Sequence, residues 1–143
     1  MSLNTALEET TDLQRYVAEA PGFTMIYDRF EPRLDLIDEI RALQPEAEVV
    51  IFCETWCGDC LRNVPRWTRI VEELPQWAHT ILPREEPHAS RYGVVRIPTI
   101  ILFDPVTGRE IGRIIENPVT SLEEDTLSML QSYYGQTAGA ADA

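Results

Sequence analysis

The chain has 143 residues, which is the size of a single domain with one substantial core. Its formal net charge is −12 at pH 7, so nucleic acid is not an expected partner, because binding to phosphate needs a basic surface. Residues 1–30 lack a basic start followed by an apolar stretch, and no apolar run is long enough to span a membrane, so we expect a cytoplasmic protein without a membrane partner.

The first half of the chain is predicted to alternate between helices and strands. Residues 4–20 have apolar side chains at helical spacing with glutamates between them, and Pro21 ends this amphipathic helix. The β-branched and aromatic side chains of residues 23–27 predict a first strand. Residues 32–43 have leucine and isoleucine three residues apart, which predicts a helix. The unbroken apolar run at 49–53 predicts a strand that is buried on both faces.

A second helix and strand are predicted to follow. Apolar side chains keep helical spacing from Cys57 to Leu74, and Pro65 within this helix is expected to bend it. Residues 78–82 predict a short strand, and residues 83–90, rich in proline and charge, predict a loop.

The last part of the chain predicts a hairpin and a helix. Residues 99–103 and 109–115 predict two strands joined by a turn. Thr120 or Ser121 is expected to cap the final helix, which Gly135 ends. The order of these elements predicts an α/β fold, with a mixed sheet and helices on both of its faces.

A pair of cysteines, Cys57 and Cys60, directly follows the strand predicted at 49–53. The unpaired backbone N–H groups and the positive dipole end of the following helix favour a thiolate on Cys57. The spacing allows the two sulfur atoms to bond with little strain. We expect Cys57, which is nearer to solvent, to attack, and Cys60, one helical turn deeper, to resolve the mixed disulfide.

A zinc site is the alternative interpretation of the same residues. Cys53, Cys57, Cys60 and either His79 or His88 could supply four ligands in principle. Structural zinc usually takes two separated ligand pairs, however, and the chain has no second Cys-x-x-Cys. The redox pair is therefore preferred, no metal or cofactor is assigned, and both histidines are expected at the surface.

The segment 56–60, Trp-Cys-Gly-Asp-Cys after an apolar strand, resembles the active-site segment of the thioredoxin family. Pro65 falls five residues after Cys60, where thioredoxins carry a helix-kinking proline. Residues 92–103 resemble the Tyr-Gly segment, cis-proline and following strand of the same family. The resemblance implies a thioredoxin-like fold.

The resemblance also implies how the chain is divided. A thioredoxin-like domain is expected at residues 23–135, with an N-terminal helical extension at 1–22. Residues 136–143 are small and polar, which predicts a disordered C-terminal tail.

The resemblance further implies a groove that binds substrate beside the thiols. The peptide bond between Ile97 and Pro98 is expected to be cis, leaving backbone groups free to pair with an extended substrate strand. Trp56 is expected to form a wall of this groove. Gly58 and Asp59, between the cysteines, complete the predicted substrate-binding residues.

The chain departs from the family pattern at several positions. Asp59 replaces the usual proline and adds a negative charge beside the attacking thiol. Ile51 stands where thioredoxins carry a buried aspartate that is thought to move the proton of the resolving thiol. Glu54 and Glu116 are candidate replacements, although both are more simply explained as solvated charges. Cys53 replaces a tryptophan and is predicted to be a buried structural thiol.

Two functions of different class are compatible with these residues. The first is a thiol–disulfide oxidoreductase that reduces disulfides of proteins or small molecules and maintains cell redox homeostasis, with electrons from a reductase or a low-molecular-weight thiol. The second is a binding or adaptor module, or a redox sensor, with weak or no reductase activity. The missing acid at Ile51 and the extra charge at Asp59 are the features that favour the second.

Overall fold

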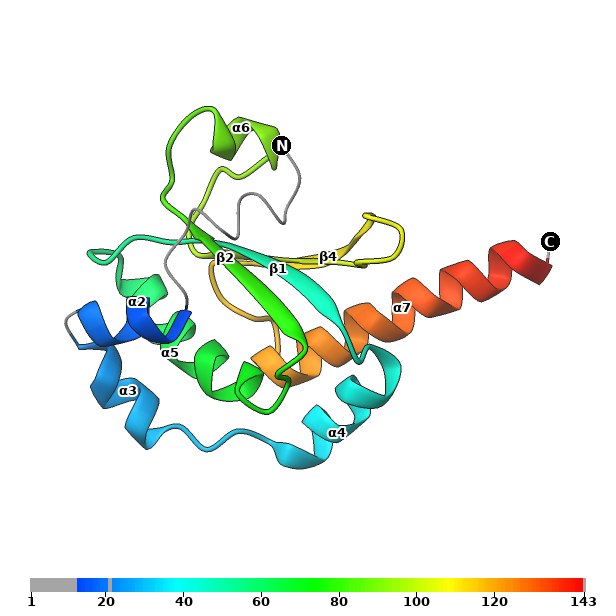
Figure 1. Cartoon of the computed structure of the whole chain (residues 1–143), viewed down its shortest axis with the longest axis horizontal. Coiled ribbons are helices and arrows are strands. Elements are labelled where there is room, and N and C mark those ends of the chain that lie inside the picture. Colours follow the sequence, from blue (N-terminus) through cyan, green and yellow to red (C-terminus); the bar gives the residue numbers. More distant parts are fainter. Residues whose placement is uncertain (1–12, 21, 143) are drawn as a thin grey trace.

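A computed structural model describes residues 13–20 and 22–142 of the chain. Its centre is a four-stranded sheet with the strand order β2-β1-β3-β4 (Figure 1). Strand β1 (Ala47–Phe52) pairs in parallel with β2 (Trp77–Leu82) and antiparallel with β3 (Thr99–Phe103). Strand β3 in turn pairs antiparallel with β4 (Glu110–Ile115). The mixed sheet predicted from the sequence is therefore confirmed.

Most of the helices lie on one face of the sheet (Figure 1). Helix α5 (Gly58–Val71) is covered by α2 (Leu13–Glu19) and α3 (Phe23–Arg29), and α7 (Leu122–Asp142) packs on β4 and on α4 (Leu34–Leu43). Both α4 and α5 begin and end within a few residues of their predicted limits. No helix in the described ranges is long and apolar enough to cross a membrane.

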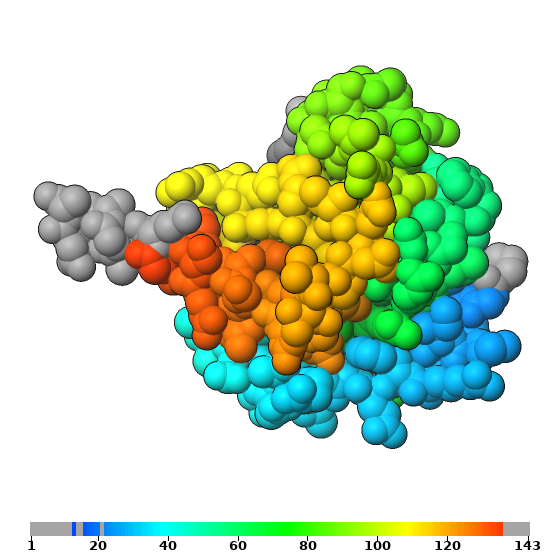
Figure 2. Space-filling model, turned by 180° about the vertical axis from the view of Figure 1, so that it is seen from behind, coloured from blue at the N-terminus to red at the C-terminus, as the bar shows by residue number. Residues whose placement is uncertain are grey.

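The opposite face carries the short helix α6 (His88–Arg91). The Tyr92 ring, directly after α6, contacts Phe52 at 5.6 Å and Phe103 at 6.0 Å between ring centroids. The space-filling view shows α6 and its flanking loops as a lobe that projects from the rest of the molecule (Figure 2). Helices therefore flank both faces, as predicted, although the coverage is uneven.

The predicted first strand at 23–27 is wrong, because these residues form the start of helix α3. Gly22, at φ 83°, precedes the helix in the left-handed conformation that favours glycine. Phe23 is fully buried, while Tyr27 and Phe30 pack against the core at intervals of three and four residues. This helical spacing prevails over the strand preference of the individual residue types.

Both ends of the chain also differ from the predictions. Helix α2 confirms residues 13–19 of the predicted N-terminal helix, and residues 4–12 lie outside the described part. Helix α7 begins as expected, since the Ser121 hydroxyl accepts a hydrogen bond from the Glu124 amide at 3.0 Å. It does not end at Gly135 but continues to Asp142, so helix replaces the predicted disordered tail there. The predicted division into domains remains a prediction.

The prediction that His79 lies at the surface holds only in part, because the residue is partly buried. The fully buried Trp67 donates its indole N–H to Nε2 of His79 at 3.0 Å, and Trp67 also contacts the ring of Trp77. Burial lowers the pKa of His79 to about 4. The two tryptophans are core residues, and they join α5 to the edge strand β2.

Acid should destabilise the fold through His79. Its pKa is lower in the folded protein than in the unfolded chain, so its stabilising contribution is complete above about pH 6.5 and is lost as the pH falls towards 4. We expect the free energy of unfolding to fall by on the order of 1–2 kcal/mol between about pH 7 and pH 5 from this residue. Denaturant titrations should show a smaller loss for His79→Gln, which keeps an acceptor for Trp67. An equal loss in His79→Gln and in the control His88→Gln would contradict this assignment.

Candidate active site

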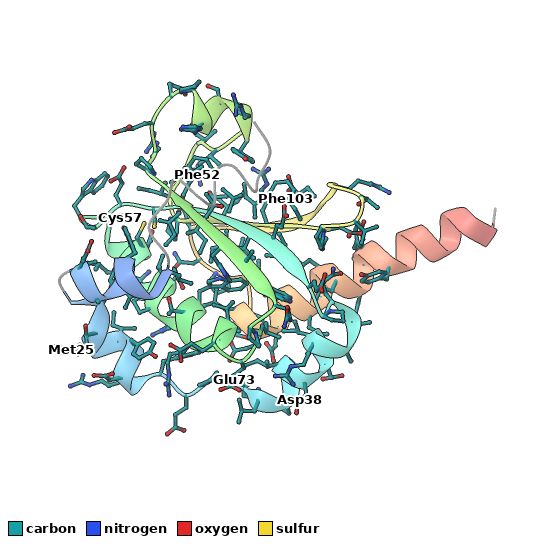
Figure 3. All side chains as sticks on the ribbon, in the orientation of Figure 1. Met25, Asp38, Phe52, Cys57, Glu73 and Phe103 are labelled. Atoms are coloured by element: carbon teal, nitrogen blue, oxygen red, sulfur yellow. The ribbon has the colours of Figure 1, made fainter. Side chains whose placement is uncertain are left out.

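The two thiols of the motif lie where β1 leads into α5. Cys57 is the N-cap residue of α5, with the extended conformation φ −84°, ψ 126°, and its carbonyl accepts the amide N–H of Leu61 at 3.0 Å. Figure 3 shows Cys57 in the loop that connects the sheet to this helix. The first amides of α5 therefore surround Cys57 with unpaired donors, as the sequence predicts.

Cys57 and Cys60 differ in their exposure to solvent. Cys57 is partly exposed, Cys60 is fully buried, and both are free thiols. The sulfur of Cys60 accepts a hydrogen bond from the Glu54 amide at 3.5 Å, but burial has the larger effect and raises the pKa of the Cys60 thiol. This asymmetry suits attack by the outer thiol and resolution by the inner one.

The loop before β3 contacts the thiol of Cys57. The Ile97–Pro98 peptide bond is cis, as the resemblance implies, and the Cys57 thiol donates to the carbonyl of Ile97 at 3.8 Å. The Ile97 side chain is buried, at 7 % exposure, so its backbone rather than its side chain faces the thiol. The structure thus brings Ile97 and Pro98 next to Cys57, and their contact with substrate remains a prediction.

Two large apolar side chains are exposed in the segments that meet at Cys57. Trp56, which precedes Cys57, is 72 % exposed, in keeping with its predicted place in a groove wall. Val95, which precedes the cis-proline by three residues, is also 72 % exposed. Val95 was not among the predicted site residues, because a valine beside a strand resembles a core residue. Exposed apolar surface of this kind marks sites of contact with other molecules.

Asp59, which lies between the two cysteines, forms an ion pair and a backbone hydrogen bond. Its carboxylate pairs with the Arg62 guanidinium at 2.5 Å, and Arg62 also donates to the Asn117 side-chain oxygen at 3.0 Å. The buried Asn63 amide donates to the Asp59 carbonyl at 3.0 Å and to the Glu116 carbonyl at 2.9 Å. The first turn of α5 is therefore tied to the loop after β4, and Arg62 balances the charge that Asp59 adds.

Among the described residues, neither carboxylate predicted to replace the missing acid is hydrogen-bonded to the Cys60 thiol. The Glu54 carboxylate accepts the Arg84 amide N–H at 3.1 Å, and the Glu116 carboxylate pairs with Arg96 at 3.2 Å. Glu116 also has φ 62°, which is unusual for a residue with a side chain. Ile51 is fully buried, so the position of the family's acid is apolar here.

Cys53 is buried, at 2 % exposure, as predicted for a structural thiol. Burial raises its pKa to about 12, so it remains protonated at neutral pH. The zinc alternative requires a histidine beside the three thiols, but Nε2 of His79 already accepts a hydrogen bond from Trp67. Within the described ranges, no three histidine, cysteine or acidic side chains are grouped as metal ligands.

Comparisons with known proteins agree with this geometry. The family model described as thioredoxin matches residues 3–126. A thioredoxin-like protein of Acanthamoeba polyphaga mimivirus is 27 % identical over 108 residues, which cover 71 % of this chain and 77 % of that protein. A crystal structure of a Pseudomonas aeruginosa protein of unknown function superposes with a TM-score of 0.71 at 14 % identity, covering 98 % of this chain and 99 % of the other. At this level of identity the structural likeness concerns the fold.

Proposed function

Because the chain belongs to the thioredoxin family, we propose that it is a thiol–disulfide oxidoreductase that reduces disulfides in the cytoplasm and so contributes to redox homeostasis. The observation that supports this most directly is the arrangement of Cys57, which is partly exposed at the start of α5, with the buried Cys60 one turn later. The Ile97 carbonyl, 3.8 Å from the Cys57 sulfur, adds a backbone group beside the thiol.

The proposed reaction has two exchange steps. The Cys57 thiolate attacks one sulfur of a substrate disulfide, forming a mixed disulfide and releasing the other substrate sulfur as a thiolate. The Cys60 sulfur then loses its proton and attacks Cys57, which closes the Cys57–Cys60 bond and releases the second substrate sulfur. Both released thiolates take up a proton, so the substrate gains two electrons and the protein pair loses two.

The proposed substrates are disulfides of proteins or small molecules, and a reductase or a low-molecular-weight thiol would return the pair to the dithiol. The exposed side chains of Trp56 and Val95 support an extended substrate segment beside Cys57, because apolar surface there can pack against it. Gly58 leaves open space next to this position, since no atom approaches within 4 Å of where a side chain would begin.

Reduction of insulin by dithiothreitol, followed by turbidity, tests the proposal. We expect the wild-type protein to accelerate precipitation, because it shuttles electrons from dithiothreitol to the insulin disulfides. The matched control is Cys57→Ser, which should act no faster than dithiothreitol alone. A wild-type rate equal to that of Cys57→Ser would favour the adaptor or sensor function, for which the buried Ile51 is the supporting observation.

A further inference from the structure

One buried amide side chain on α5 bonds to both the motif and the loop after β4. Asn63 is 2 % exposed, and its Nδ2 group donates to the Asp59 carbonyl at 3.0 Å and to the Glu116 carbonyl at 2.9 Å. The side-chain oxygen of Asn117 is a further acceptor at 2.9 Å. Asparagine is a poor helix former, and a buried amide is costly unless it is bonded. These bonds, rather than helix preference, account for an asparagine at this position.

The loop residue that Asn63 holds has a strained backbone. The amide N–H of Asn117 donates to the carbonyl of Ile115 at 2.8 Å, so residues 115–117 form a three-residue turn. Glu116, at its centre, has φ 62°. Turns of this kind with a positive φ at the centre are rare and strained. They persist only where the surrounding contacts fix them, and they are frequent at functional sites.

Glu116 is fixed from its other side by the loop that precedes β3. Its amide N–H donates to the carbonyl of Pro98 at 2.7 Å, and its carboxylate pairs with the Arg96 guanidinium at 3.2 Å. The strained turn is therefore bonded to the residues on both sides of Ile97.

The contacts return to α5 at the attacking thiol. The Ile97 carbonyl lies 3.8 Å from the Cys57 sulfur, and the Ile97 amide N–H donates to no other backbone group among the described residues. We propose that Asn63 is a positioning residue that acts through Glu116. It holds the Ile97 backbone beside Cys57 as an edge that pairs with an extended peptide substrate. This inference rests on the proposed function.

The proposed role predicts a preference for disulfides that lie within peptides. A peptide can form backbone hydrogen bonds with Ile97 while one of its sulfur atoms exchanges with Cys57. A small disulfide without peptide groups undergoes the exchange alone. Loosening the loop should therefore slow the reaction with a peptide disulfide and spare the reaction with a small one.

Two disulfides test this preference in Asn63→Leu, which keeps a side chain of similar size and removes the amide. Reduced protein is mixed with excess insulin or hydroxyethyl disulfide, stopped with acid and alkylated, and the oxidised fraction is followed by mass spectrometry. We expect the insulin rate to fall roughly three- to tenfold, the usual range for loss of one hydrogen bond, and the other rate to change by less than about twofold. A purely structural role would lower both rates by the same factor, and that result would overturn the inference.

Two further variants provide a control and a milder test. Thr68→Val removes a buried hydroxyl from the same helix, where it is bonded to the Val64 carbonyl, and should change neither rate. Asn117→Ala removes one acceptor of Asn63 at an exposed residue and should lower the insulin rate alone, by about twofold. If Asn63→Leu does not fold, Asn117→Ala decides the question.

Failure of this inference is distinguishable from failure of the proposed function. Oxidation of the wild-type protein by neither disulfide would overturn both. Oxidation of the wild-type protein by both disulfides, with an unchanged ratio of the two rates in Asn63→Leu and in Asn117→Ala, would overturn this inference alone.

Discussion

Replacing Cys60 by serine should turn a transient mixed disulfide into one that accumulates. The partly exposed Cys57 remains able to attack, but no thiol lies one turn deeper to displace the adduct. Mass spectrometry after mixing reduced protein with glutathione disulfide should show close to one glutathione per chain in Cys60→Ser. The wild-type protein should instead lose two hydrogens and carry no adduct.

The buried Cys53 supplies the matched control for this prediction. Cys53→Ser also removes a buried thiol near the motif but leaves the Cys57–Cys60 pair intact. It should form the internal disulfide as the wild-type protein does. Accumulation of the adduct in Cys53→Ser, or its absence in Cys60→Ser, would show that Cys60 is not the resolving thiol.

Replacing Trp67 by alanine should cause the largest loss of stability. Trp67 is fully buried between α5 and the sheet, and it donates the hydrogen bond that His79 accepts. Truncation leaves a cavity and an unpaired imidazole nitrogen, so we expect the free energy of unfolding to fall by about 3–5 kcal/mol. Denaturant unfolding followed by circular dichroism would measure this change.

A second tryptophan allows the effect of burial to be separated from that of residue type. Trp56 is 72 % exposed, so Trp56→Ala should change the free energy of unfolding by no more than about 0.5 kcal/mol. Similar losses for the two alanine variants would contradict the assignment of Trp67 to the core.

Much of the fold could be predicted because the hydrophobic pattern of the sequence agrees with the burial of the same residues in the structure. The apolar run of β1 is buried at almost every position, and the strand leads directly into the cysteine pair at the start of α5. Pro98 could be placed just before β3 because proline cannot donate a backbone hydrogen bond within a strand. At these positions the local preference and the tertiary contacts favour the same structure.

The remaining features depend on contacts between segments far apart in the sequence. Residue types alone suggested a strand at Phe23, whereas burial against α5 selects a helix. His79 acquires its role from Trp67, which is twelve positions away in sequence. The Arg62–Asn117 bond joins residues 55 positions apart, and no local pattern indicates it.

The reactivity of Cys57 is the most direct test of the central claim, which is that a thiolate at the start of α5 exchanges electrons with Cys60. Iodoacetamide modification of the reduced protein at neutral pH should label Cys57 considerably faster than free cysteine under the same conditions. Prior oxidation should protect it through the Cys57–Cys60 bond. Labelling no faster than that of free cysteine, with no protection after oxidation, would contradict the catalytic role and leave only the fold.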